Sequence, residues 1–398
     1  MLYSRRDIGK IGVAAAFASG LRSKLVAAAK PNSKIKGVQI GTITYSYRSM
    51  PDQSAEATLQ YIVDSGISAI ELMGGPVNDW ARKKGQWDSS PAAAAAAALG
   101  NAGGRGGRGG GRGGPGGRGP EPAYPLVASM KTGFGNDQPA GQWNGKACPA
   151  GRGGGPGPGG PGGMGARGGG GGRGRGEQTP EQKAAADAER KWRLGLSMDI
   201  FTELRKMYND AGVSIYAVKD VRQDTDEDLD YTFTVARTLG ASHVTLECPT
   251  GANASATFKR MGDWALKYKM FAAYHTHQQG SMTVFDEAFA ISKGNMANVD
   301  LGHFMAATDP GGTPLDFLNK FHDRIASYHL KDRTTVAHCA LNLPWGTGET
   351  PIKEILQTVA KNKWTMPGSI ELEYEIPEGS SAVEEVAKCL QFCRQALA

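Results

Sequence analysis

The chain has 398 residues and a formal net charge of +6, but 33 of its 57 glycines lie between residues 101 and 176. A segment this rich in glycine cannot bury enough apolar surface to offset its chain entropy, which excludes it as a folding domain. Residues 1–30 and 101–176 together hold 16 of the 45 Lys and Arg residues against three acidic ones, so the rest of the chain is acidic. An acidic body disfavours a nucleic-acid partner, and no apolar run of 18 residues is present to span a membrane.

The first 30 residues are typical of an export signal. Residues 4–10 read SRRDIGK, an apolar run follows at 11–21, and three alanines at 27–29 offer a small-residue cleavage site. The pattern resembles a twin-arginine signal peptide, which directs folded proteins out of the cytoplasm. We therefore expect a signal peptide over 1–30 and a periplasmic mature protein.

Beyond the signal, short β-branched runs alternate with helical patterns. Strands are expected at Lys36–Tyr45, Ile67–Met73, Val213–Val218, His243–Glu247, Phe271–His277, Asn298–His303, Ile325–Leu330 and Ser369–Tyr374. Helices are expected at Asp52–Ser65, Thr179–Asn209, Asp226–Leu239, Ser255–Tyr268, Val284–Ser292, Pro314–Phe321, Pro351–Lys361 and Ala382–Leu397. Eight strands alternating with eight helices predict a (β/α)8 TIM barrel. An open doubly wound sheet is the alternative, but no G-x-G-x-x-G loop follows the first strand.

A Gly/Arg-rich insert interrupts the barrel domain, which we place at 31–398. The insert covers 85–178, after the second strand, and we expect it to be disordered. Its GGRGG repeats resemble segments that bind nucleic acid, but the Gly/Arg runs contain no aromatic residues for base stacking. A flexible loop expansion on the barrel face that carries active sites is the simpler interpretation.

The five cysteines have no metal-binding spacing, and their odd number gives no disulfide framework. Cys389 and Cys393 lie four residues apart on the last helical pattern and so share one face. We expect them to be buried free thiols. Cys339, in the loop after the seventh strand, belongs to no recognisable motif.

Metal-capable side chains gather at the carboxyl ends of the expected strands. Glu247 ends the fourth strand, His275 and His277 the fifth, Asp300 and His303 lie in the sixth, His329 and Lys331 close the seventh, and Glu371 and Glu373 lie in the eighth. In a TIM barrel these ends meet at one rim. Several histidines and carboxylates there are hard to explain as core, because each buried polar group needs a partner.

We expect one divalent metal ion, held by Glu247, Asp300, His329 and Glu373. Carboxylate oxygens with one imidazole suit a hard or borderline ion, so Mn²⁺ is favoured, with Mg²⁺, Co²⁺ and Zn²⁺ as alternatives. Nothing specifically indicates zinc, because the set has neither a thiolate nor three histidines.

These motifs give the chain a family resemblance. Glu at the end of strand four, Asp-x-x-His on strand six, His-x-Lys-Asp on strand seven and Glu-Tyr on strand eight resemble the xylose isomerase-like TIM barrel superfamily, and within it the sugar phosphate isomerase/epimerase group. The sequence LPWGTG at 343–348 is similar to that group's turn after strand seven. The resemblance covers 34–398 apart from the insert, and it does not specify the sugar.

The resemblance also implies residue roles. In ketose 3-epimerases of the superfamily, the two glutamate ligands serve as acid and base on opposite faces of the sugar, which implies Glu247 and Glu373 here. Glu373 is preferred to Glu371 because it stands five residues after Gly368, as in relatives, although both are expected to face inward. His303 is implied to touch a substrate hydroxyl.

Four other side chains are candidate substrate contacts. His275 and His277 lie at the expected rim, and Lys331 either binds a hydroxyl or phosphate or forms an ion pair. Glu71, at the end of the second strand, either lines the pocket or pairs with a neighbour.

The implied activity is sugar isomerisation or epimerisation. A metal that chelates a carbonyl and an adjacent hydroxyl stabilises the enediolate formed when a carboxylate removes the α-proton. If a leaving group lies β to the carbonyl, the same chemistry gives a lyase or dehydratase acting on a keto-sugar or 3-keto-glycoside. A non-catalytic sugar-binding barrel is a third interpretation, which intact Glu247 and Glu373 disfavour. A small sugar is the expected partner, without membrane or nucleic acid, and a homo-oligomer stays open.

Overall fold

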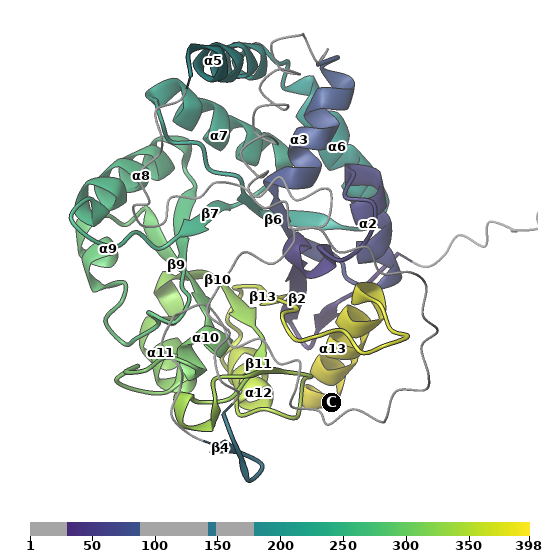
Figure 1. Ribbon diagram of the computed structural model, residues 1–398, viewed down its shortest axis with the longest axis vertical. Helices are drawn as coiled ribbons and strands as arrows, with labels where there is room; N and C mark the ends of the chain where they lie inside the picture. Colours follow the sequence, from purple (N-terminus) through teal and green to yellow (C-terminus); the bar gives the residue numbers. More distant parts are fainter. Residues whose placement is uncertain (1–29, 88–141, 149–178) are drawn as a thin grey trace, which may run out of the picture.

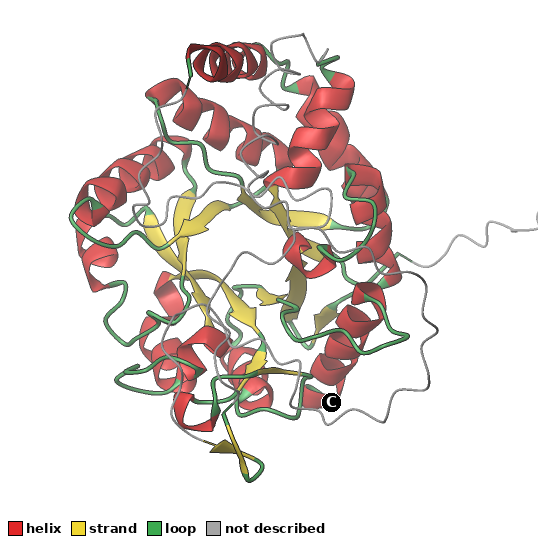
Figure 2. Ribbon diagram, viewed as in Figure 1, coloured by secondary structure: helices red, strands yellow, loops and turns green. Residues whose placement is uncertain are grey.

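A computed structural model, described for residues 30–87, 142–148 and 179–398, contains a closed parallel barrel with helices around it (Figures 1 and 2). Within these residues the barrel strands are β2 (Val38–Ile43), β3 (Ala69–Met73), β6 (Ser214–Lys219), β7 (His243–Glu247), β8 (Phe271–His275), β9 (Asn295–Asp300), β10 (Ile325–Leu330) and β13 (Gly368–Ile370). Each strand pairs with the next in parallel, and β13 pairs with β2 to close the ring. The expected (β/α)8 TIM barrel is confirmed.

The helices cover the outer face of this ring (Figure 2). They are α2 (Ala55–Asp64), α3 (Gly74–Lys84), α5 (Pro180–Leu194), α6 (Asp199–Asp210), α7 (Asp226–Leu239), α8 (Ala254–Tyr268), α9 (Asp286–Ile291), α10 (Leu301–Met305), α11 (Pro314–Phe321), α12 (Ile352–Asn362) and α13 (Ala382–Ala396). In the described part of the chain, none is long and apolar enough to cross a membrane.

Local sequence explains where these helices begin and end. The Thr225 hydroxyl accepts a hydrogen bond from the backbone N–H of Asp228 at the start of α7, and the Ser381 hydroxyl does the same for Glu384 at the start of α13. Such caps satisfy backbone donors that have no partner inside the helix. Helix α7 ends at Leu239 and is capped by Gly240, whose φ of +90° lies in the left-handed region that glycine adopts most readily.

Several element boundaries differ from the sequence expectation, and three of the differences change how the fold is interpreted. The expected strand Asn298–His303 is β9, which ends at Asp300, and His303 lies in the short helix α10. The Asp300 carboxylate accepts the backbone N–H of His303 at 2.7 Å, so Asp300 caps a helix inside the segment that was expected to be a strand. The expected strand Ser369–Tyr374 ends at Ile370, so both of its glutamates lie just beyond β13.

The third difference is the expected helix Thr179–Asn209, which is two helices, α5 and α6. The break contains Gly195, a poor helix residue. It allows α6 to pack beside β6 and α7, while α5 contacts α7 from outside.

Helix α3, which the sequence did not predict, follows β3 directly and ends at Lys84, just before the expected insert at 85–178. Most of the insert, with its expected disorder, and the expected signal peptide lie outside the described residues. The described piece is a hairpin of β4 (Gln142–Trp143) and β5 (Lys146–Ala147), visible at the lower edge of Figure 1.

A disulfide between Cys148 and Cys339 joins this hairpin to the loop after β10. The interpretation that the cysteines give no disulfide framework is therefore wrong, because an odd count does not prevent one pair from forming across 191 residues. Cys389 and Cys393 are buried free thiols, as expected.

One carboxylate organises the turn that follows β10. Asp332, in β11 (Asp332–Arg333), accepts the backbone N–H groups of Gly346, Thr347 and Gly348 on Oδ2 at 2.8, 3.1 and 2.9 Å, and that of Thr350 on Oδ1 at 3.2 Å. A Cβ atom at Gly348 would lie 2.3 Å from Asp332 Oδ1, so the turn passes too close to accept a larger residue there.

We predict that Asp332→Asn lowers the free energy of unfolding by about 1–3 kcal/mol, because the amide presents donors where the carboxylate accepts. Chemical denaturation of both proteins measures the difference. The exposed Asp309→Asn is the control and should change stability little. Equal stability of wild type and Asp332→Asn would contradict the role assigned to this turn.

Candidate metal centre

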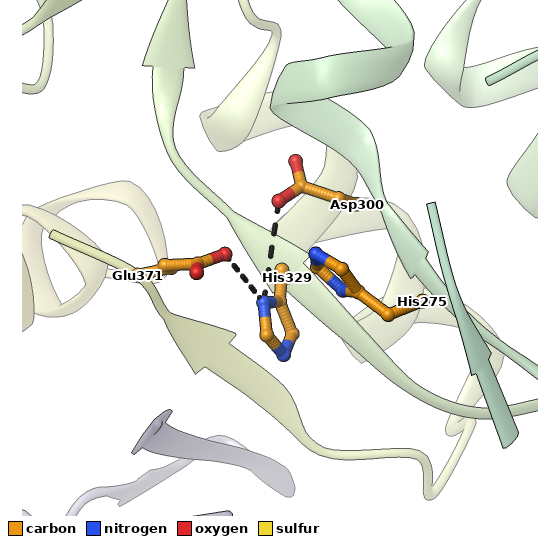
Figure 3. Close-up of side chains that lie close together, drawn as sticks. All are labelled: His275, Asp300, His329 and Glu371. Atoms are coloured by element: carbon orange, nitrogen blue, oxygen red, sulfur yellow. Dashed lines mark hydrogen bonds and ion pairs between the residues drawn. The ribbon is translucent and has the colours of Figure 1, made fainter. Parts of the chain in front are cut away.

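Histidine and carboxylate side chains from four neighbouring segments converge at the carboxyl end of the barrel (Figure 3). His275 ends β8, Asp300 ends β9, His329 lies in β10, and Glu371 follows β13. One ligand atom from each lies within 4.8 Å of the other three, and all four residues are buried. Parallel strands bring these positions to one rim, which is why residues 96 apart in sequence meet.

The imidazole of His329 lies between two carboxylates. Its Nδ1 is 2.7 Å from Glu371 Oε2 and 4.0 Å from Asp300 Oδ2. Dashed lines mark both contacts in Figure 3. Its Nε2 is 2.7 Å from Glu71 Oε2 on the other side of the ring. The ring is therefore held by Glu71 while Nδ1 faces the other candidate ligands.

Glu71 is itself fully buried and held from several directions. Its Oε1 accepts the hydroxyl of Thr245 at 2.6 Å, and its Oε2 accepts the side-chain amide of Asn298 at 3.1 Å. Burial raises the pKa of Glu71, but the charge of His329, with Lys219 and Thr245, outweighs it and lowers the pKa to about 2. Glu71 thus pairs with neighbours beneath the rim.

The charge of His329 follows from the same contacts. Burial lowers the pKa of the imidazole, but the carboxylates of Glu71 and Glu371 outweigh it and raise the pKa to about 10. In the protein without metal, the ring is therefore a cation between two anions. A metal ion would take the place of the Nδ1 proton, since metal ligands must be deprotonated.

The ammonium group of Lys331 forms ion pairs with three carboxylates at the site. This group lies 2.9 Å from Asp300 Oδ2, 2.9 Å from Glu371 Oε2 and 2.7 Å from Glu373 Oε2. Buried carboxylates need a positive charge nearby, because an unpaired charge away from water costs free energy. Two carboxylates and two imidazoles with ligand atoms this close fit a divalent ion of the hard or borderline class.

Glu247 and Glu373 lie outside the four-residue cluster. Glu247 is 2.9 Å from Lys219 Nζ and 3.4 Å from His277 Nδ1. Glu373 is 2.7 Å from Lys331 Nζ and 3.6 Å from His303 Nε2. Because β7 and β13 are the fourth and eighth strands of the ring, these glutamates come from opposite sides of the barrel mouth.

The histidines connect the two sides. The ring centres of His277 and His303 are 4.9 Å apart, and those of His275 and His277 are 5.0 Å apart. Of the four ligands expected from sequence, the structure brings Asp300 and His329 together, and it places His275 and Glu371 beside them. Glu247 forms a second group with His275 and His277.

The sequence analysis did not select three further residues of this site. Lys219 ends β6, Asn298 lies in β9, and Arg333 follows the His-x-Lys-Asp motif. Inward alternation along the strands could have selected the first two. Arg333 is fully buried and its guanidinium donates to His303 Nδ1 at 2.6 Å, a contact that depends on the path of a loop.

A hydrogen-bond network continues from the site into the barrel. The Asn298 amide donates to Ser327 Oγ at 2.8 Å, which is 2.9 Å from His243 Nε2. His243 Nδ1 is 2.9 Å from the hydroxyl of Ser242, near the amino end of β7. Burial lowers the pKa of His243 to about 4, so this ring is neutral at pH 7.

Comparison with known proteins yields similarities of fold. No protein-family profile matches the sequence, and no curated protein matches it. A probable 3-DHS dehydratase from Bacillus anthracis has 11% identity and a TM-score of 0.48, with 89% of this chain and 97% of that one covered. A sugar phosphate isomerase/epimerase from Parabacteroides distasonis has 13% identity and a TM-score of 0.46, with 89% and 95% covered.

A third solved structure, a D-psicose 3-epimerase in the presence of D-fructose, has 12% identity and a TM-score of 0.40, with 52% of this chain and 86% of that chain covered. At these identities the likeness concerns the arrangement of the chain and not the activity. The strand ring and the ligand cluster of the structure itself define the chain as a TIM barrel with a buried candidate metal centre.

Because His243 is buried, we expect the free energy of unfolding to depend on pH. Its pKa in the folded protein, about 4, lies below the ordinary value of 6.5, so the unfolded chain takes up the proton first. The free energy of unfolding should therefore fall as the pH falls from about 6.5 to about 4. We predict that His243→Gln, which cannot titrate, shows a smaller loss of melting temperature over this interval. His322→Gln, at a half-buried ring that stacks on Trp364 away from the site, is the control. An identical acid slope in wild type and His243→Gln would refute the prediction.

Proposed function

We propose that the protein is a divalent-metal-dependent enzyme that isomerises or epimerises a small sugar. The observation that supports this most is the position of the buried ligand cluster between Glu247 and Glu373, two carboxylates supplied from opposite sides of the barrel mouth. Such chemistry needs a polarised carbonyl and two proton-transfer groups, and a binding protein needs neither.

We assign the metal to His275, Asp300, His329 and Glu371, with Mn²⁺ as the favoured ion. The assignment takes Glu371 in place of Glu373, because only the former lies within ligand distance of the other three. A divalent ion held there would act as a Lewis acid on substrate oxygens. Glu71 orients the His329 ring by accepting its Nε2–H, which leaves Nδ1 for the ion.

Glu247 and Glu373 are then free to move protons. One carboxylate removes the proton from the carbon next to the carbonyl, and the other returns a proton to the neighbouring carbon or to the opposite face. Ion pairs with Lys219 and Lys331 hold the two carboxylates in place. His277 and His303 line the space between them and suit hydroxyl groups of the sugar.

We also propose that the protein is exported to the periplasm. The SRRDIGK sequence at 4–10 supports this, and so does the disulfide between Cys148 and Cys339, since such bonds persist in oxidising compartments.

Proton exchange tests the proposed reaction. The Mn²⁺-loaded protein, incubated in D₂O with a panel of free ketoses and aldoses, should introduce deuterium next to the carbonyl of at least one sugar. Glu373→Gln should slow this exchange by about 10²–10⁴-fold, the usual contribution of a general acid or base. Loss of water or of an alcohol from a keto-sugar would show a lyase instead.

The same variants separate ligands from proton-transfer residues. Glu371→Gln should weaken Mn²⁺ binding strongly, and Glu71→Gln by about 10–100-fold, since neighbours that orient a ligand have effects of that size. Glu373→Gln should bind Mn²⁺ nearly as wild type does, in titrations followed by electron paramagnetic resonance. Glu385→Gln, which removes a buried carboxylate away from the site, is the control. Normal binding by Glu371→Gln with loss in Glu373→Gln would reverse our assignment.

Variants of the expected signal peptide test the proposed export. Replacing Arg5 and Arg6 by Lys should leave the precursor in the cytoplasm of a Gram-negative host, because this address is read by a receptor. Cell fractionation and blotting measure the distribution. Undiminished periplasmic protein from the double variant would refute a twin-arginine route.

A further inference from the structure

A buried arginine links the candidate site to the disulfide loop. Arg333 has 0% exposure, and each of the two terminal nitrogens of its guanidinium has a hydrogen-bond partner. Nη1 donates to His303 Nδ1 at 2.6 Å, and Nη2 donates to the backbone carbonyl of Ala340 at 2.5 Å. The arginine therefore spans from a candidate substrate contact to the residue that follows Cys339.

The first contact determines the tautomer of His303. A guanidinium has only donors, so Nδ1 of the imidazole must accept and cannot carry a proton. The ring then carries its proton on Nε2. That atom is buried, lies 3.6 Å from Glu373 Oε2 and has no hydrogen-bond partner among the described residues. His303 thus presents an unpaired N–H toward a proton-transfer carboxylate.

The second contact depends on a loop in an unfavourable backbone conformation. Cys339 and Ala340 have φ values of +77° and +47°, in the left-handed region that is unfavourable for a residue other than glycine. Such a conformation persists only where the surroundings hold it. Here the loop is held by the disulfide to Cys148 and by packing of Trp143 against the small core of Cys339, Leu341 and Leu343.

The geometry points to Arg333 as a positioning residue that fixes the Nε2–H of His303 toward the substrate, and to the Cys148–Cys339 disulfide as the clamp that fixes Arg333. The N–H is suited to a hydroxyl or carbonyl oxygen of the substrate. For its kinetic consequence the inference rests on the proposed function. For its structural consequence it does not, because the tautomer of His303 can be observed without substrate.

The direct test is the side-chain ¹⁵N spectrum of His303. Wild type should show the tautomer protonated on Nε2. Arg333→Met should give a mixture of tautomers, and Cys148→Ser, which breaks the clamp at the hairpin, should shift His303 in the same direction. Mild reduction of wild type should reproduce the effect of Cys148→Ser without a mutation that threatens folding. Cys393→Ser, at a buried free thiol, should leave the His303 signals unchanged.

A double-mutant cycle tests the connection. With a sugar that is turned over, Arg333→Met should lower kcat by about tenfold or more, the size expected when a buried hydrogen-bond partner is removed. Cys148→Ser should lower it less, and Cys148→Ser should add little in the Arg333→Met background. Mn²⁺ affinity should stay at the wild-type value in all three, since no ligand is altered.

Two results would overturn the inference. One is an unchanged His303 tautomer in Cys148→Ser and in reduced wild type, with mass spectrometry confirming the disulfide in the untreated protein. The other is an effect of Cys148→Ser that is equally large with and without Arg333. If no sugar is turned over, the proposed function fails, while the ¹⁵N result still decides the inference.

Discussion

The buried contact between Glu71 and His329 is the interaction on which the centre depends. Two charged groups without exposure to water are stable only when each compensates the other, and removing one partner of such a pair typically costs about 3–5 kcal/mol. Thr245 and Asn298 complete the hydrogen bonds of Glu71, so the carboxylate cannot turn away. The imidazole is therefore fixed before any ion binds, and the other candidate ligands are arranged around its Nδ1.

Two histidines of the site are oriented by different neighbours, one a hydrogen-bond acceptor and the other a hydrogen-bond donor. His329 meets an acceptor, the carboxylate of Glu71, and so directs Nδ1 to the candidate metal centre. His303 meets a donor, the guanidinium of Arg333, and so directs an N–H toward Glu373. The same side chain can thus serve as a metal ligand in one place and as a hydrogen-bond donor in the other, because the partner behind each ring decides which nitrogen carries the proton.

The site also extends beyond the strands that build it. Of its two proton-transfer candidates, Glu247 ends a barrel strand and Glu373 follows one. The partner of His303, however, is held by a loop, and that loop is tied to a hairpin of the insert. A segment that contributes no ligand is therefore coupled to the geometry of the barrel mouth. This gives the described part of the insert a structural connection that composition alone did not suggest.

Local pattern was enough to predict the barrel and the rim. Alternating β-branched runs and helical stretches gave the order of the strands, because strand and helix periodicity are properties of neighbouring residues. The buried thiols of Cys389 and Cys393 followed from helical spacing in the same way. Polar residues at strand ends indicated the site, since the carboxyl ends of parallel strands meet at one face.

Only the tertiary structure decided which of those polar residues meet. Glu371 and Glu373 share the same parity, and their difference arises from the chain leaving β13 at Ile370 and from contacts with His329 and Lys331. The helical position of His303 and the pairing of Cys148 with Cys339 depend on caps and loop paths that involve residues distant in sequence. Such contacts are set by packing in three dimensions, and periodicity along the chain carries no information about them.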